Sequence, residues 1–287
     1  MTCCSAGIEQ GTFESLAGHW QQILEDSAEP TFFDSQTWQK TWWSEFGNDS
    51  ELQLLMVRSE SGDVNMIAPL MIDGSEISFL GSTDLVDYHD FLSRDRLSST
   101  CIQSLVSAVS QMSEIDTILL QSLPGNSPTI TQFREKAENA GWQVELEQED
   151  VAPRMDLPAS WDEYVSALRK KDRHELRRKL RRLEAVGEVN HVELSDSTDI
   201  ENSMADFIRL HRMSTPDKSA FMTTEREQFF CKIAIELARE GITRLCFLEI
   251  DGVREATSLS FVSGEVRYLY NSGYNPAQSN LSVGLLN

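Results

Sequence analysis

The stretch that decides the fold runs from Leu245 to Asn287 and reads LCFLEIDGVREATSLSFVSGEVRYLYNSGYNPAQSNLSVGLLN. Its three apolar runs are separated by Asp251-Gly252 and Ser263-Gly264, dipeptides that tolerate the positive φ angles of two-residue hairpins. We therefore predict a three-stranded antiparallel meander. Beyond it, Ser282 is a candidate helix N-cap, and Gly284 allows the backbone to approach a ligand closely. A strand, a tight turn and a helix start together form an anion site from free N–H groups.

Similar patterns occur earlier in the chain. The turn glycines at 62 and 74 are twelve residues apart, as are those at 252 and 264. Paired helices before a meander of the same spacing, twice, predict a duplicated α/β fold divided into residues 1–150 and 151–287. Periodicity predicts helices at 13–24, 35–46, 97–112, 128–140, 161–184, 200–213 and 224–239. It predicts further strands at 52–57, 64–70, 77–80, 117–120, 142–146, 154–155 and 189–194.

The meander followed by Leu281-Ser-Val-Gly284-Leu-Leu resembles the core of the GNAT acyltransferase superfamily, and more closely its CelD/FemAB-like acetyltransferase group. The resemblance implies two GNAT-like (acyl-CoA N-acyltransferase) halves, each a mixed, largely antiparallel sheet flanked by helices, with the coenzyme bound by the second half only. It implies acyl transfer, with acetyl-CoA as donor, to an amine or hydroxyl of a small molecule, sugar or cell-envelope precursor.

The same resemblance implies a set of coenzyme contacts. Leu269, Tyr270 and Asn271, on the last strand of the meander, pair with the pantetheine arm, and the turn formed by Leu281, Ser282, Val283 and Gly284 cradles the pyrophosphate. The family turn usually holds more glycines than this one, so an ordinary helix N-cap after a hairpin is the alternative.

Two residues are candidates for the chemistry, in which an amine must lose a proton before it attacks a thioester. Tyr274 follows Gly273 and offers a hydroxyl at the cleft, and His211 is a possible base or acceptor contact. The alternative for His211 is a structural histidine. The sequence shows no nucleophile in a strained-turn signature and no metal-ligand spacing.

The loop after the first meander carries Asp87 and Tyr88 and lacks a Ser-x-Gly turn. Its carboxylates would repel a phosphate. One interpretation is a polar pocket in which Asp87 and Tyr88 face the cleft between the halves and bind the acceptor. The alternative is a solvated loop.

The segment from Leu168 to Glu184 holds nine of the 25 basic residues, and its leucines share one helical face. Such a basic helix can bind nucleic acid, a membrane surface or a phosphorylated small molecule. Arg173 and Arg177, spaced i and i+4, can clamp a phosphate or carboxylate of the substrate. The alternative is a solvated helix paired with acidic neighbours.

Composition excludes several classes. With 46 acidic residues and a net charge of −21, most of the surface repels nucleic acid and anionic lipid. Five cysteines without a CxxC pair argue against a disulfide framework or a zinc site. No run of residues is long and apolar enough for a membrane span, and no secretion signal begins the chain, so we expect a cytoplasmic protein.

Two rival functions stay open. One is FemAB-like aminoacyl transfer with the basic helix holding aminoacyl-tRNA, and the other is a degenerate, non-catalytic binding module. The GNAT pattern continues past the turn at Ser282, so we expect a C-terminally truncated second half, with weak or no coenzyme binding. We also expect self-association through the open sheet edge.

Overall fold

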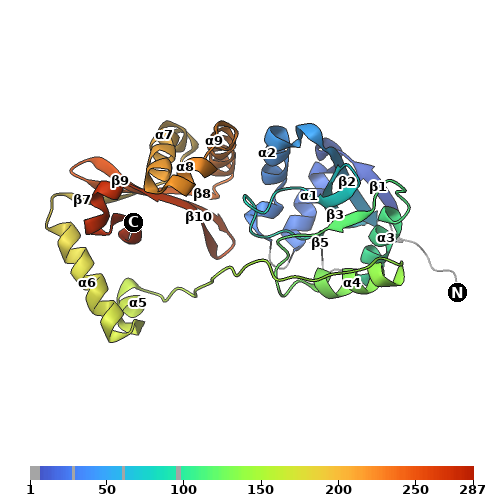
Figure 1. Cartoon of the computed structure of the whole chain (residues 1–287), viewed down its shortest axis with the longest axis horizontal. Coiled ribbons are helices and arrows are strands. Elements are labelled where there is room, and N and C mark those ends of the chain that lie inside the picture. Colours follow the sequence, from blue (N-terminus) through green and yellow to red (C-terminus); the bar gives the residue numbers. More distant parts are fainter. Residues whose placement is uncertain (1–6, 28–29, 60–61, 95–97) are drawn as a thin grey trace. The chain divides into compact units, whose positions relative to one another are not determined.

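The computed structural model describes residues 7–27, 30–59, 62–94 and 98–287, which fold as two compact units, Met1–Val151 and Ala152–Asn287 (Figure 1). Cys3, Cys4 and the predicted helix start at Leu97 lie outside the described residues. Both units are α/β, as predicted. No helix of the described part combines the length and the apolar character that crossing a membrane requires.

The N-terminal unit contains a mixed sheet. Its strands are β1 (Ile8–Gly11), β2 (Glu51–Arg58), β3 (Val64–Asp73), β4 (Glu76–Phe79), β5 (Leu92–Ser93) and β6 (Thr117–Leu119), and its helices are α1 (Phe13–Asp26), α2 (Gln36–Phe46), α3 (Ser99–Val109) and α4 (Pro128–Asn139). The sheet order is β1-β2-β3-β4-β6, with β5 paired to β3, and only the β4–β6 pair is parallel.

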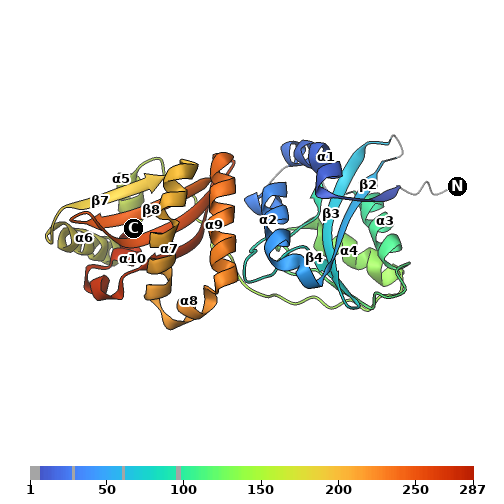
Figure 2. The same ribbon diagram turned by 90° about the horizontal axis from the view of Figure 1, so that it is seen from above.

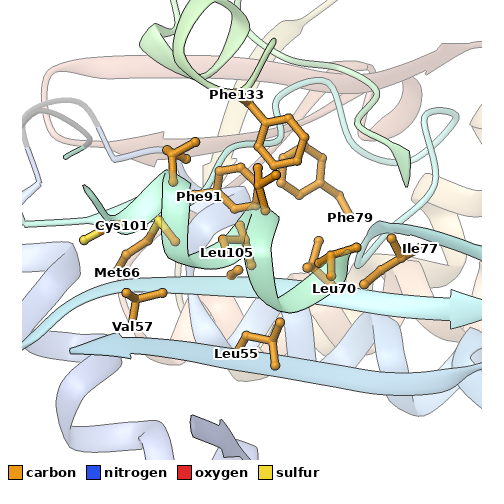
Figure 3. Close-up of a cluster of buried hydrophobic side chains, with 14 of the residues drawn as sticks. Leu55, Val57, Met66, Leu70, Ile77, Phe79, Phe91, Cys101, Leu105 and Phe133 are labelled. Atoms are coloured by element: carbon orange, nitrogen blue, oxygen red, sulfur yellow. The ribbon is translucent and has the colours of Figure 1, made fainter. Parts of the chain in front are cut away.

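The core of this unit explains why its strands and helices form where they do. Alternate residues of β2 and β3, such as Leu55 and Met66, face α3, whose Leu105 is 1% exposed (Figure 3). Phe91 stacks on Phe133 of α4, with ring centroids 5.9 Å apart. Burying these side chains contributes about 1.5–3 kcal/mol each, and this burial fixes the register of the strands.

The C-terminal unit contains an antiparallel sheet in the order β10-β9-β8-β7. Its strands are β7 (Val189–Leu194), β8 (Thr243–Ile250), β9 (Val253–Ser263) and β10 (Val266–Tyr274), and its helices are α5 (Trp161–Ala167), α6 (Lys170–Glu184), α7 (Ser197–Ser214), α8 (Pro216–Phe221), α9 (Thr224–Arg239) and α10 (Val283–Leu286). Helices α7, α8 and α9 lie on one face of this sheet, and α6 lies toward the other (Figures 1 and 2).

The two units repeat one topology. In each, a strand pairs with the first strand of a three-stranded meander, so that β1-β2-β3-β4 corresponds to β7-β8-β9-β10. The four turn glycines have φ angles of +91°, +60°, +77° and +56°, a region that glycine occupies without strain. The twelve-residue spacing therefore reflects equivalent hairpins, and the repeat extends to a strand that the sequence did not predict, β1.

Two predicted strands are wrong. Residues 142–146 and 154–155 form no strand. Apolar residues do alternate at the first site, and Trp142 and Val144 pack against the core. No strand of the described residues pairs with this segment, however, and the Trp142 side chain is held by a hydrogen bond from its Nε1–H to Ser110 Oγ (2.8 Å). The sequence also missed α8, although Thr215 and Pro216 are a typical N-cap and first-turn pair.

Candidate active site

Strand β10 is the edge of the C-terminal sheet and contains a bulge. Leu269 is opposite Ser260 and Asn271 is opposite Leu259, so Tyr270 is an extra residue between them. The Tyr270 ring stacks on Phe230 of α9, with centroids 5.4 Å apart. Within the described part of the chain, no strand pairs with the outer edge of β10. A bulge in an edge strand leaves main-chain groups available to a ligand and re-aims side chains.

Ser282 lies after β10 in a left-handed conformation, with φ 60° and ψ 34°. Its carbonyl accepts from Leu285 N–H (3.0 Å) and Leu286 N–H (3.1 Å). Among the described residues, the N–H groups of Val283 and Gly284 have no hydrogen-bond acceptor. A left-handed residue followed by helical residues points successive N–H groups to one side, which makes a concavity suited to an anion.

The structure adds two details to this turn. Ser282 stands at the N-cap position, as predicted, but its side chain makes no capping hydrogen bond. Gly284 does not have a positive φ, and its missing side chain makes room for a protein group. A Cβ there would lie 2.7 Å from Tyr274 Cδ1. The ring of Tyr274 therefore rests on the turn and fixes the turn against the end of β10.

Tyr274 also fixes the end of β10 against α7. Its N–H donates to Ser214 Oγ at 2.8 Å, and Ser214 is buried in the last turn of α7. One residue earlier, a Cβ on Gly273 would lie 2.5 Å from His211 Cα and from the Leu210 carbonyl carbon. The sequence Gly273-Tyr274 thus allows a helix and an edge strand to approach at backbone distance.

His211 lies beneath β10 and is 1% exposed. Its Nε2 is 2.8 Å from Asn271 Oδ1, and its ring lies among Phe207, Phe221 and Phe230. Burial lowers the pKa of His211 to about 4, so the imidazole is neutral near pH 7. Because the amide oxygen accepts, Nε2 carries the proton, an assignment that follows from the network. This enclosure favours a positioning role, in which His211 orients the residue that follows the bulge.

The two arginines predicted to clamp an anion differ in their surroundings. Arg173 is half-buried, and its Nη1 donates to the carbonyls of Ser166 (2.8 Å) and Leu168 (3.3 Å), which holds the turn between α5 and α6. Arg177 is exposed and forms no ion pair with any described residue. Arg177 is therefore the one of the pair whose whole guanidinium is available to an anion.

The loop that carries Asp87 and Tyr88 is partly packed and partly exposed. Asp87 is at the surface, where desolvation and the charge of Asp150 raise its pKa. The Tyr88 ring lies 6.2 Å from Phe33. Next to them, His89 is buried and stacks on Phe79. The loop is thus anchored in the N-terminal core by His89, while Asp87 stays exposed.

Two carboxyl groups near this loop escaped the sequence analysis. Asp90 accepts hydrogen bonds from Ser127 Oγ, Thr129 Oγ1 and Phe91 N–H. Asp34 accepts from both the N–H and the hydroxyl of Thr31 at 2.8 Å. Burial raises the pKa of Asp34 to about 6, with the Asp90 charge adding to the effect. Both groups orient loops and helix starts in the structure.

A groove of about 400 Å³ on the open face of the C-terminal sheet was also missed. Arg267 Nη1 donates to Glu193 Oε2 (2.8 Å), its Nε donates to Ser260 Oγ (3.0 Å), and its Nη2 donates to Cys246 Sγ (3.1 Å). Partial burial raises the pKa of Glu193, but the bond and charge of Arg267 outweigh it and the net shift is downward. Polar residues alternating along β7 and β9 are the signal that could have predicted this polar face.

Metal ligands are absent from the part of the chain that the structure covers, where no three His, Cys, Asp or Glu side chains converge. The described cysteines Cys101, Cys231 and Cys246 are free thiols. Burial raises the pKa of each, so none is primed as a thiolate nucleophile.

Comparison with known proteins relates the C-terminal part of the chain to one family. The family model described as "Acetyltransferase (GNAT) domain" matches residues 170–287. The chain has the fold of FemX, whose crystal structure it matches with a TM-score of 0.64 and 11% identity, over 96% of this chain and 82% of FemX. No curated protein sequence matches.

Two other solved structures match with a TM-score of 0.46 each. A tandem GNAT protein of clavulanic acid biosynthesis is 12% identical, over 98% of this chain and 82% of its own. The C-terminal domain of a putative lysylphosphatidylglycerol synthetase from Agrobacterium fabrum is 13% identical, over 96% and 74%. Residues 170–287 of this chain thus match the GNAT acetyltransferase domain, and the chain as a whole has the fold of FemX.

Proposed function

We propose that the C-terminal unit transfers an acyl group, and specifically acetyl, from acyl-CoA to an amine or hydroxyl of a small molecule, sugar or cell-envelope precursor. One observation carries the proposal. The bulge of β10 and the Ser282 turn are joined by Tyr274, whose ring rests on Gly284. An available strand edge and an anion-binding turn thus belong to one rigid assembly, within a domain of an acyltransferase family.

The residues present suit coenzyme A. The unbonded N–H groups of Val283 and Gly284 are donors for a pyrophosphate, and Leu281 is buried beneath them and holds the turn on the core. The edge of β10 at Leu269, Tyr270 and Asn271 is proposed to pair with the amides of the pantetheine arm. When bound, the coenzyme supplies the activated acyl group as a thioester.

The chain's own groups would orient the acceptor and stabilise charge. Main-chain N–H groups at a bulge can polarise a carbonyl, and they are worth more when their geometry is fixed in advance. His211 fixes Asn271 by the 2.8 Å contact and is the proposed positioning residue. The Tyr274 hydroxyl is proposed as the acid that protonates the leaving thiolate, because Tyr274 joins the strand end to the turn.

Acceptor contacts are proposed in both units. Arg177 would bind an anionic group of the acceptor. Arg173 would assist through the guanidinium N–H groups that do not donate to the carbonyls of Ser166 and Leu168. In the N-terminal unit, Asp87 and Tyr88 are the proposed contacts for an amine or hydroxyl, held by a partly packed loop.

The test is transfer of label from acetyl-CoA to a panel of amines, amino sugars and precursor molecules, using the whole chain and two variants of one residue. Ser282→Gly keeps a residue that adopts the left-handed backbone freely and should retain coenzyme-dependent transfer. Ser282→Val places a β-branched residue at φ 60° and should lose it, with circular dichroism showing an intact fold. Equal activity of the two variants would show that this turn does not hold the coenzyme.

A second function, aminoacyl transfer from aminoacyl-tRNA, is favoured by the FemX fold over 96% of the chain and by the exposed cations of α6. A salt series distinguishes the two. Phosphate contacts by several cations make RNA affinity fall steeply with salt, whereas coenzyme bound mainly through main-chain groups depends on salt weakly. Steep, selective tRNA binding without acetyl-CoA binding would replace the first proposal by the second.

A further inference from the structure

The cations of α6 are not matched by carboxylates from the rest of the unit. Elsewhere in the C-terminal unit, arginines pair with carboxylates, as in Arg212–Glu227 (2.8 Å) and Arg267–Glu193 (2.8 Å). On α6, the ion pairs with described residues are both local: Arg178–Glu175 and Arg169–Asp172. Pairing with acidic neighbours, the alternative considered from the sequence, thus accounts for Arg169 and Arg178 but not for the other cations of the segment.

The unmatched cations form a surface. Lys170, Arg177 and Arg181, spaced i, i+7 and i+11, follow one line along the helix, and Lys171 lies beside it. Arg178 and Arg182 are not part of this set, because Arg178 pairs with Glu175 and Arg182 Nη1 donates to Asn280 O (2.7 Å). Leu183, on another face, is buried against Leu281 and Val283 of the core and anchors the helix. Lys170, Lys171, Arg177 and Arg181 are exposed and lie on a face of α6 other than the one that packs on the core.

Charge separation is pronounced. Residues 169–184 contain nine Lys and Arg and three Asp and Glu, which gives this segment a net charge of +6. Because the whole chain carries −21, the remaining residues carry −27. The Debye length at physiological ionic strength is about 8 Å, so a partner at this helix is attracted locally while the rest of the surface is screened. An anionic, extended partner fits this distribution.

Exposed apolar side chains precede or begin α5 and follow α6 along the chain. Met155, Leu157, Trp161 and Val186 are exposed by 59%, 74%, 57% and 44%. Trp161 begins α5, and the bond from Arg173 to Ser166 O ties α5 to the start of α6. Tryptophan beside cations is typical of membrane interfaces, and aliphatic side chains gain energy in a bilayer but little from stacking on nucleic-acid bases.

We propose that the face of α6 formed by Lys170, Lys171 and Arg181, together with Trp161 at the start of α5, docks on an anionic phospholipid bilayer. The docking surface goes beyond acyl transfer and does not depend on it. The cations lie at the headgroup level, and Trp161 inserts at the boundary between headgroups and acyl chains. RNA is the competing partner, and the exposed aliphatic side chains favour lipid over it.

The expected effect follows from the number of cations. Each Lys or Arg near an anionic surface changes the partition coefficient by about five-fold. The variant Lys170→Gln/Lys171→Gln/Arg181→Gln should therefore bind about 100-fold more weakly. These three residues form no ion pair with described residues, so their replacement leaves the folded unit intact. Trp161→Ala should also weaken binding to the vesicles, and this loss should not depend on the salt concentration.

The test is co-sedimentation of the whole chain with vesicles of phosphatidylglycerol and phosphatidylcholine, and with vesicles of phosphatidylcholine alone, at 50 mM to 500 mM salt. The matched control, Lys40→Gln/Arg134→Gln/Lys136→Gln, removes the same charge from the N-terminal unit, where all three residues form ion pairs. Anionic vesicles should bind the wild type and the control, and acrylamide should quench Trp161 less when vesicles are present.

Three results would overturn the proposal. Absence of binding to anionic vesicles at low salt excludes a lipid surface. Equal weakening by the α6 variant and the control shows a net-charge effect without a docking face. Binding of tRNA, but not of vesicles, that the α6 variant abolishes assigns the face to RNA.

Discussion

Replacing Gly273 by alanine tests the approach of α7 to β10 on which the candidate site depends. The added Cβ would lie 2.5 Å from His211 Cα and from the carbonyl carbon of Leu210. Carbon atoms pack at about 3.5–4.0 Å, so helix and strand must separate by about 1 Å. Because the opposing atoms are backbone, no side-chain rotation can relieve the clash.

The magnitude follows from that separation. Overpacking costs about 1–3 kcal/mol. Separation also weakens the contact between His211 Nε2 and Asn271 Oδ1, now 2.8 Å, which contributes about 1 kcal/mol net. The sum is about 2–4 kcal/mol, and at about 2–4 °C per kcal/mol the melting temperature should fall by roughly 5–15 °C.

The assay is thermal unfolding followed by circular dichroism, together with NMR titration of His211. In Gly273→Ala, the pKa of His211 should rise from about 4 toward the ordinary value as water reaches the ring. Gly18→Ala is the control, because a Cβ there meets no atom within 4 Å and alanine favours the helix. An unchanged melting temperature and an unchanged His211 pKa in Gly273→Ala would refute the close approach.

The other predictions concern anchoring and pH. Leu183→Ala should lower the free energy of unfolding in urea by about 2–5 kcal/mol, because Leu183 is 1% exposed. Leu180→Ala, at a half-buried position, should lower it clearly less. The reverse order would show that Leu183 is not the anchor of α6. Burial lowers the pKa of His89 and of His211 to about 4. Each histidine therefore contributes up to about 3 kcal/mol of stability above about pH 6.5, and this contribution is lost as the pH falls through 4. A flat melting temperature from pH 7 to pH 4 would contradict this. Asp34 acts in the opposite direction, because burial raises its pKa to about 6. It contributes stability at low pH that is lost as the pH rises through 6. Asp34→Asn should therefore raise the melting temperature at pH 8 but not at pH 4, and equal effects at both would refute the raised pKa.

The sequence predicted most of the fold because its strongest signals are local. Asp251-Gly252 and Ser263-Gly264 indicate hairpins within a few residues, and the structure confirms both hairpins, although the second turn is formed by Gly264 and Glu265, one residue later than predicted. Helix α6 was predicted from leucine spacing alone. The wrong strand at 142–146 shows the limit, since alternation indicates one buried face and says nothing of whether a partner strand is present.

The site itself was less predictable because it depends on contacts between distant segments. His211 and Asn271 are separated by 60 residues, and so are Ser214 and Tyr274. The bulge at Tyr270 is a mismatch between two strands, which one strand's sequence cannot display. The side chain that Gly284 makes room for, Tyr274, is likewise visible only in the folded chain.

The measurement that tests the central claim most directly is NMR mapping of acetyl-CoA on the isotope-labelled chain, at coenzyme concentrations high enough to detect weak binding. The largest amide shifts are expected at Val283 and Gly284, with smaller shifts along Leu269, Tyr270 and Asn271. All of them should disappear in Ser282→Val but not in Ser282→Gly. Shifts confined to other residues, or shifts that Ser282→Val leaves unchanged, would contradict a coenzyme site at this turn.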